Sequence, residues 1–266
     1  MAEILAIRDL DRVIDDRRLE CRMIGDPGAV VSPLLFLHEG LGSVSLWRDF
    51  PQALCRAVGR PGLVYSRLGY GGSEPLPGPR DPRFMHDEAE GALPALIEAF
   101  GLDAPVLIGH SDGASIALIH AGRFPGKARA VVAMAPHLFV EPVCLESIAA
   151  AAAGYRKDRT GEPGFRERLA RYHADVDGAF EGWADVWLSP GFVRWNIEAE
   201  VAAIRCPLLA IQGRQDQYGT MRQIHRIAEL APQAQLVELE HCQHSPHLDQ
   251  PAAVIREISR FLAAST

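Results

Sequence analysis

The sequence predicts an α/β fold in which a mostly parallel sheet is covered by helices on both faces. Short apolar runs of strand type alternate with amphipathic stretches of helical spacing along the 266 residues. Some of these runs, such as PLLFL at 33–37, are apolar at every position, as strands buried on both faces are. Several runs lead into loops with polar residues, and in sheets of this kind ligands bind at the carboxyl ends of the strands.

The expected elements follow this alternation along the chain. Residues 4–10 and 18–24 predict a small antiparallel pair of strands, followed by turn residues at 25–28. Buried strands are expected at 33–37, 62–66, 106–108, 128–135, 206–212 and 234–240. Helices are expected at 44–58, at 84–100, from 114 onward, at 219–231 and at 251–263.

The alternation is interrupted between Pro136 and Arg205. Amphipathic helical pieces replace it, around residues 144–157, 164–173, 176–188 and 192–203. Three of the four tryptophans fall in this segment, and the strand pattern resumes after it. We therefore expect a core formed by residues 1–135 and 206–266, with residues 136–205 inserted as a helical cap.

Composition excludes several classes of protein. A net charge of −7 argues against nucleic acid or an anionic membrane as partner, and no apolar run approaches the length of a membrane span. The first 18 residues are charged throughout and contain no signal-peptide core, which predicts a cytoplasmic protein. The five cysteines are odd in number, scattered and without a C-x-x-C pair, as in a reduced set. The sequence does not predict an oligomeric state.

The central motif is PVLIGHSDGASIAL at residues 105–118, where G-x-S-x-G joins a strand pattern to a helix pattern. This arrangement is typical of a nucleophile elbow, with Ser111 at its apex. The glycines at 109 and 113 remove side chains that would clash in so tight a turn. The hydroxyl of Ser111 would then lie above the N-terminus of the helix, where backbone N–H groups can meet a developing oxyanion.

A nucleophilic serine needs a base within hydrogen-bond reach and an acid that orients the base. Asp216 follows the strand at 206–212, and His244 follows the strand at 234–240. With Ser111 they occur in the order Ser, Asp, His, each just beyond the carboxyl end of a strand. The sequence therefore predicts a catalytic triad of Ser111, His244 and Asp216.

Five motifs resemble those of the α/β-hydrolase superfamily with a helical lid. They are HEGLGS at 38–43, RLGYGGS at 67–73, GHSDG at 109–113, GRQD at 213–216 and HSPHLDQP at 244–251. The resemblance covers most of the chain and implies the α/β-hydrolase fold. It also implies an oxyanion hole formed by the backbone N–H groups of Gly40 and Asp112. Glu39 departs from the pattern, because the family usually has glycine there.

Other interpretations of the polar residues remain open. The resemblance selects His244 from a crowded group that includes His241 and His247, and the same group with Cys242 and Asp249 has the composition of a metal site. Its spacing fits no common zinc pattern, so we expect no metal. Glu141 is the rival for the role of the acid, whereas His110, beside the nucleophile, is expected to support the site from behind.

We expect hydrolysis of an ester-type bond (carboxylester, lactone or thioester) of a small apolar or aromatic molecule, through an acyl-enzyme on Ser111. Candidate pocket residues are two polar groups near strand ends and three tryptophans of the inserted segment: Glu39, His137, Trp183, Trp187 and Trp195. Arg67 and Arg194 are the cations available to a charged substrate. No Gly-rich nucleotide fingerprint is present, so no cofactor is expected.

Three alternatives share the same fold. A C–C bond hydrolase of ring-cleavage products is favoured by the pair Arg194-Trp195 but disfavoured by Ser245, because similar enzymes usually have Trp directly after the catalytic His. A cofactor-free haloperoxidase or oxygenase uses the same scaffold. A ligand receptor with a vestigial triad is the third, and the retention of every expected catalytic group disfavours it.

Overall fold

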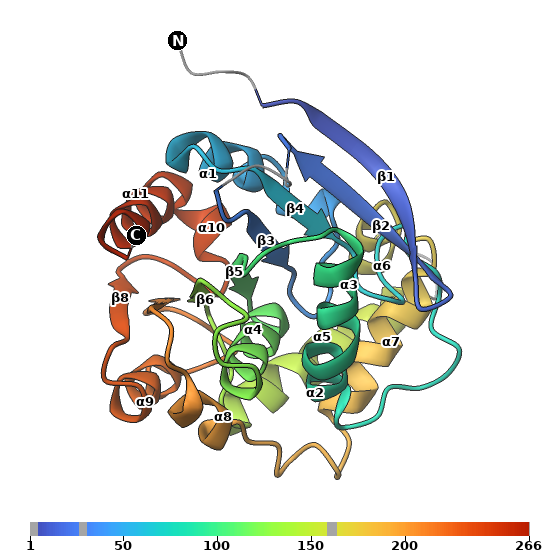
Figure 1. Ribbon diagram of the computed structural model, residues 1–266. Coiled ribbons are helices and arrows are strands. Elements are labelled where there is room, and N and C mark those ends of the chain that lie inside the picture. The colour runs from blue at the N-terminus through green and yellow to red at the C-terminus, as the bar shows by residue number, and fades with distance from the viewer. Residues whose placement is uncertain (1–4, 27–30, 159–163, 266) are drawn as a thin grey trace.

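The structure, a computed structural model, describes residues 5–26, 31–158 and 164–265. Its centre is one twisted sheet, which runs across the molecule in Figure 1. Within the described residues the strands lie in the order β1-β2-β4-β3-β5-β6-β7-β8. Their bounds are β1 Ile7–Ile14, β2 Arg17–Ile24, β3 Leu34–Leu37, β4 Gly62–Tyr65, β5 Val106–His110, β6 Ala130–Met134, β7 Leu208–Gly213 and β8 Gln235–Leu239.

The sheet is antiparallel at one edge and parallel elsewhere. β1 pairs antiparallel with β2, and β2 with β4, whereas β4, β3, β5, β6, β7 and β8 are all parallel. This confirms the predicted fold class. β1 begins three residues later than the first predicted strand. The expected strand residue Ile4 and the expected turn residues Pro27 and Gly28 lie outside the described residues.

Helices cover both faces of the sheet, as Figure 1 shows for α1 and α11 on one side and α4 on the other. The helices outside the β6–β7 connection are η1 Ser45–Trp47 (a 3-10 turn), α1 Phe50–Val58, α2 Phe84–Asp87, η2 Glu88–Ala92 (a π-helical turn), α3 Leu93–Ala99, α4 Asp112–Arg123, α9 Arg222–Leu230, α10 Pro246–Asp249 and α11 Pro251–Ala264. Alternate strand residues serve the two layers: Leu34 and Phe36 pack in the α1 and α11 layer, and Leu35 and Leu37 in the α4 layer.

Between β6 and β7 the described part of the chain is mainly helical, and we call residues 135–207 the β6–β7 helical segment. Its helices are α5 Pro142–Asp158, α6 Phe165–Leu169, α7 Val176–Trp187 and α8 Glu198–Ala203. α5 packs on α7 through the stacked rings of Tyr155 and Phe180. α8 packs closely on α4, because a Cβ at Gly122 would lie 2.1 Å from the carbonyl oxygen of Glu200. The division into a core and a cap at residues 136–205 stays a prediction.

Two expected helices are shorter or more broken than predicted. The helix expected at 192–203 begins only at Glu198, because Asn196 forms a β-bridge with Phe139 and its side chain accepts the N–H of Glu198 at 2.8 Å. The helix expected at 84–100 is divided into α2, η2 and α3, with Pro94 in the first turn of α3. Proline has no N–H to donate to the preceding turn, which favours such a break. In the described residues no helix combines the length and apolar character needed to cross a bilayer.

Candidate active site

Ser111 lies at the sharp turn between β5 and α4, in a backbone conformation that is unfavourable for a side-chain-bearing residue. Its φ is 53° and its ψ is −120°. The flanking glycines allow this turn: a Cβ at Gly109 would lie 2.5 Å from the α-carbon of Ala114, and a Cβ at Gly113 would lie 2.1 Å from the carbonyl oxygen of Leu37. Strain of this kind persists where surrounding structure enforces it, and it is frequent at active sites. The turn has the geometry of a nucleophile elbow.

His244 and Asp216 lie within hydrogen-bond reach of this serine, in a linear arrangement. The Ser111 Oγ is 2.9 Å from Nε2 of His244. Nδ1 of His244 is 2.8 Å and 2.9 Å from the two carboxylate oxygens of Asp216. The carboxylate fixes the proton on Nδ1, which leaves Nε2 free to accept the serine proton. The structure thus brings together the three residues that the sequence predicts.

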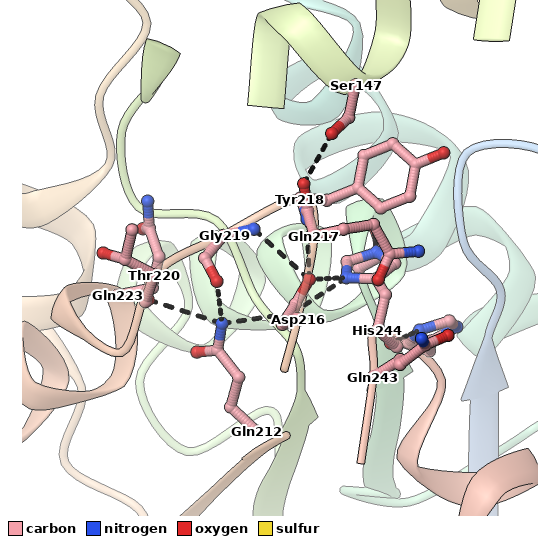
Figure 2. A network of polar contacts seen from close by, with 12 residues as sticks. Ser147, Gln212, Asp216, Gln217, Tyr218, Gly219, Thr220, Gln223, Gln243 and His244 are labelled. Atoms are coloured by element: carbon pink, nitrogen blue, oxygen red, sulfur yellow. Dashed lines mark hydrogen bonds and ion pairs between the residues drawn. The ribbon is translucent and has the colours of Figure 1, made fainter. Parts of the chain in front are cut away.

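The carboxylate of Asp216 is held by several donors besides His244, as Figure 2 shows. It accepts the backbone N–H groups of Tyr218 at 2.8 Å and Gly219 at 3.3 Å, and the side-chain amide of Gln212 at 3.1 Å. Burial alone would raise the pKa of Asp216, but the charge and hydrogen bond of His244 and the Tyr218 N–H outweigh it, so the pKa lies below its usual value. Asp216 therefore stays ionised and can stabilise an imidazolium.

The two predicted oxyanion donors lie on the other side of Ser111. Asp112 is the first residue of α4, where a backbone N–H has no acceptor within the helix. Gly40 lies in the loop after β3, and both residues line the same cavity as Ser111. A Cβ at Gly40 would lie 2.1 Å from Nε1 of Trp183, so this helix α7 residue packs directly on the loop.

The cavity that contains Ser111 is small, with a volume of about 100 Å³. Four of the five predicted pocket residues line it: Glu39, His137, Trp183 and Trp187. Trp195 does not line this cavity: its indole stacks on Phe192 and lies beside Trp187. Its place in a substrate pocket stays a prediction. A larger hollow of about 570 Å³ lies between residues 76–82 and α7, and no predicted site residue lines it.

Sequence reasoning missed four residues that line the cavity. They are Leu41, Cys144, Ile148 and Tyr218. Two signals were present: Cys144 and Ile148 are four residues apart on α5 and share one face, and Tyr218 follows Asp216 by two residues on the same turn. Neither signal shows that this face of α5 or this turn is directed toward the cavity, because that depends on how the helices pack.

Glu39 interacts with His110 behind the serine. A carboxylate oxygen of Glu39 lies 3.4 Å from Nδ1 of His110, and Nε2 of His110 lies 2.7 Å from the carbonyl oxygen of His244. Burial acts to lower the pKa of His110 and to raise that of Glu39, but their mutual contact outweighs burial in both and favours the ion pair. His110 thus supports the site from behind, as expected, and connects the Glu39 loop to the His244 loop.

The rival carboxylate and the other histidines of the crowded group have contacts of their own. Glu141 accepts hydrogen bonds from Thr220 and Gln223, not from His244. His241 is exposed, whereas His247 packs against the rings of Trp47 and His110. In the described residues no group of three His, Cys, Asp or Glu side chains could hold a metal ion.

Comparisons with known proteins agree with this geometry. A family model described as alpha/beta hydrolase family matches residues 34–257. A proline iminopeptidase of Levilactobacillus brevis is 26% identical over 91% of this chain and 92% of its own. A 2-hydroxymuconate semialdehyde hydrolase of a Pseudomonas species is 25% identical over 87% of each chain. The crystal structure of VinJ superposes with a TM-score of 0.78 at 21% identity, over 97% of this chain and 99% of that one.

The family model spans most of the chain, including the elbow, the loop after β3 and the residues that follow β7 and β8. The VinJ structure has the same fold, but its sequence identity of 21% supports no conclusion about this chain beyond the fold. One of these two relatives is named as an iminopeptidase and the other as a semialdehyde hydrolase, so their names do not define the bond that this enzyme cleaves. The chain belongs to the alpha/beta hydrolase family and is an enzyme of that type.

Proposed function

We propose that this protein is a serine hydrolase that cleaves an ester-type bond of a small, uncharged acyl compound. The observation that carries the proposal is the hydrogen-bonded series Ser111, His244, Asp216, of which Ser111 and His244 line the small cavity. Ser111 Oγ attacks the carbonyl carbon while His244 takes its proton. The backbone N–H groups of Gly40 and Asp112 then bind the oxyanion.

The tetrahedral intermediate collapses by breaking the bond from the carbonyl carbon to the leaving oxygen, which receives the proton from His244. Water, deprotonated by His244, attacks the resulting acyl-enzyme and releases the acid and Ser111. Asp216 stays ionised throughout and stabilises the imidazolium in both steps, which its lowered pKa supports.

The volume and charge of the cavity support the substrate class. A cavity of about 150 Å³ holds a benzene molecule, so a volume of about 100 Å³ favours an acyl group of a few carbon atoms. The residues that line it include no lysine or arginine in the described part of the chain, and Glu39 is held ionised beside His110. A carboxylate-bearing acyl group would find no cationic side chain among these lining residues.

The same argument disfavours a C–C bond hydrolase of acidic ring-cleavage products, although one curated relative carries such a name. Arg194, the cation that the sequence offers for this role, is exposed, and its neighbour Trp195 does not line the cavity. Arg67 is buried behind the loop after β3 and is also absent from the lining.

The test is hydrolysis of p-nitrophenyl acetate, butanoate and octanoate by the wild type and by Ser111→Ala. We expect the highest kcat/KM for the two short esters and a loss of at least about 10³-fold in Ser111→Ala. Ser259→Ala, on α11 at the far side of the sheet, is the matched control and should keep wild-type activity. A preference for octanoate would contradict the small acyl class, and an unchanged Ser111→Ala would contradict the nucleophile.

A further inference from the structure

The peptide that joins Glu39 to Gly40 is held by an unusual number of hydrogen bonds on its carbonyl side. The carbonyl oxygen of Glu39 accepts three donors. They are the backbone N–H of Gly42 at 3.1 Å, Nδ1 of His38 at 2.7 Å and Nη2 of Arg67 at 2.8 Å. A carbonyl oxygen has two lone pairs, so this one is fully engaged.

The tautomer of His38 follows from a second contact. Nε2 of His38 is 2.9 Å from the backbone nitrogen of Arg67, which donates its N–H. Nε2 therefore carries no proton, and Nδ1 is the donor to Glu39. Burial holds the pKa of His38 well below its usual value, which keeps the ring neutral.

The orientation of this carbonyl determines where the N–H of Gly40 points. In a trans peptide the C=O and N–H bonds lie in one plane and point in opposite directions. With the Glu39 oxygen turned toward Arg67 and His38, the Gly40 N–H is turned away from them, and Gly40 lines the cavity beside Ser111. Hydrogen bonds to the carbonyl also polarise the peptide and strengthen its N–H as a donor.

Arg67 is a buried cation whose ion pair with Asp112 is long, at 3.9 Å between Nη2 and Oδ2. Its side chain has no exposed surface, and among the described residues its Nε and Nη1 have no hydrogen-bond partner. The Oδ2 atom of Asp112 likewise accepts no hydrogen bond from the described part of the chain. A buried charge is costly unless it is paired and hydrogen-bonded. What Arg67 does bind is the carbonyl of Glu39 and, at 3.4 Å, that of His38.

We propose that Arg67 is the positioning residue of the oxyanion hole: it fixes and polarises the Glu39–Gly40 peptide, and its charge lies behind the place where the oxyanion forms. Arg67 contacts both halves of the hole, the Glu39–Gly40 peptide directly and the side chain of Asp112 at 3.9 Å. A fixed cation in a site of low dielectric acts strongly on a charge that develops nearby, and it needs no reorganisation during the reaction. This inference rests on the proposed function, because it concerns the same hole.

The test compares Arg67→Met and Arg67→Lys with Arg80→Met. Arg80 is a matched control because its guanidinium also lies over the ring of Tyr70 and also donates to a loop carbonyl, that of Leu68 at 2.9 Å. Two quantities are measured: kcat and KM for p-nitrophenyl acetate, and the rate at which a fluorophosphonate labels Ser111. The rate of labelling depends on the oxyanion hole but not on the identity of the natural substrate.

We expect Arg67→Met to lower kcat and the labelling rate by the same factor, about 10- to 100-fold, with little change in KM, since loss of one direct oxyanion donor costs about 10²- to 10³-fold. Arg67→Lys keeps the charge and should recover part of both rates. Arg80→Met should keep both. Equal losses in Arg67→Met and Arg80→Met, or a loss seen only in KM, would overturn the inference.

The outcomes separate this inference from the proposed function. If the wild type is labelled but hydrolyses no ester, the proposed function fails and the labelling rates still decide the role of Arg67. If Arg67→Met does not fold, Arg67→Lys decides: a folded protein with wild-type kcat and labelling rate would show that the planar guanidinium is not needed to orient the peptide, and would overturn the inference. A wild type that is neither labelled nor active would overturn both.

Discussion

The two sides of Ser111 are built from different parts of the chain. On the base side, His244 and Asp216 act through side chains that contact each other and the serine directly. On the oxyanion side, the proposed donors are the backbone N–H groups of Gly40 and Asp112, and the side chains of Arg67 and His38 hydrogen-bond to the carbonyl of the Glu39–Gly40 peptide. The base side thus depends on which side chains are present, whereas the oxyanion side depends on the backbone conformation of a loop.

The largest expected effect is on the base side. Asp216→Asn should lower kcat by about 10³- to 10⁴-fold, because an amide cannot keep the proton on Nδ1 of His244 or stabilise the imidazolium. The measurement is kcat for p-nitrophenyl acetate at neutral pH, with circular dichroism to confirm folding.

Glu141→Gln is the control for this change. The side chain of Glu141 is 5% exposed and that of Asp216 is 1% exposed, but Glu141 bonds to Thr220 and Gln223. We expect it to lose about 1 to 3 kcal/mol of unfolding free energy while the folded protein keeps kcat within about tenfold. If Glu141→Gln loses as much kcat as Asp216→Asn, the assignment of the acid is wrong.

An intermediate effect is expected from Gly40→Ala on the oxyanion side. The added Cβ would lie 2.1 Å from Nε1 and 2.4 Å from Cδ1 of Trp183, two atoms of a rigid ring. The loop or the indole must shift, and a displaced Gly40 N–H should lower kcat by about 10- to 100-fold.

Trp183→Leu tests whether this clash is the cause. In a double-mutant cycle, Gly40→Ala should lose less activity in the Trp183→Leu background than in the wild type, because the contact is gone. An equal loss in both backgrounds would show that the loop responds to the methyl group for another reason.

The same contrast explains what the sequence can predict. Ser111, Asp216 and His244 are recognisable because each follows an apolar strand pattern in a parallel sheet, and strand ends meet at one edge. The fold class and the place of the inserted helices follow from the same alternation. These inferences need only local patterns and one topological rule.

Trp195 and Arg67 show where such reasoning ends. Trp195 is one of three tryptophans in the β6–β7 helical segment, and only the packing of Phe192 and Trp187 around it keeps it from the cavity. Arg67 follows β4 as an ordinary loop residue, and nothing in its neighbours predicts a fully buried guanidinium. Both outcomes depend on contacts between segments far apart in the chain, which no local pattern contains.

The smallest expected effect is on the pH dependence of stability, in which His137, near His244, is compared with His110, which is paired with Glu39. Burial lowers the pKa of His137, whose ring centre is 5.9 Å from that of His244, to about 3. In the unfolded chain a histidine has a pKa of about 6.5. Below that pH the unfolded chain therefore binds a proton at His137, whereas the folded chain does not. Stability from this group is present above about pH 6.5 and is lost as the pH falls.

Between pH 6.5 and 4.5, His137→Asn should therefore lose about 2 kcal/mol less unfolding free energy than the wild type. His110, paired with Glu39, has a raised pKa, so its stabilisation is present below about pH 6.5 and is lost as the pH rises through that raised value. His110→Asn should then flatten the alkaline side of the profile instead of the acid side. Urea unfolding across pH 4.5 to 9 measures both. Variants that flatten the same side of the profile would show that His110 and His137 do not differ in charge in the folded protein, and would contradict the ion pair of His110 with Glu39.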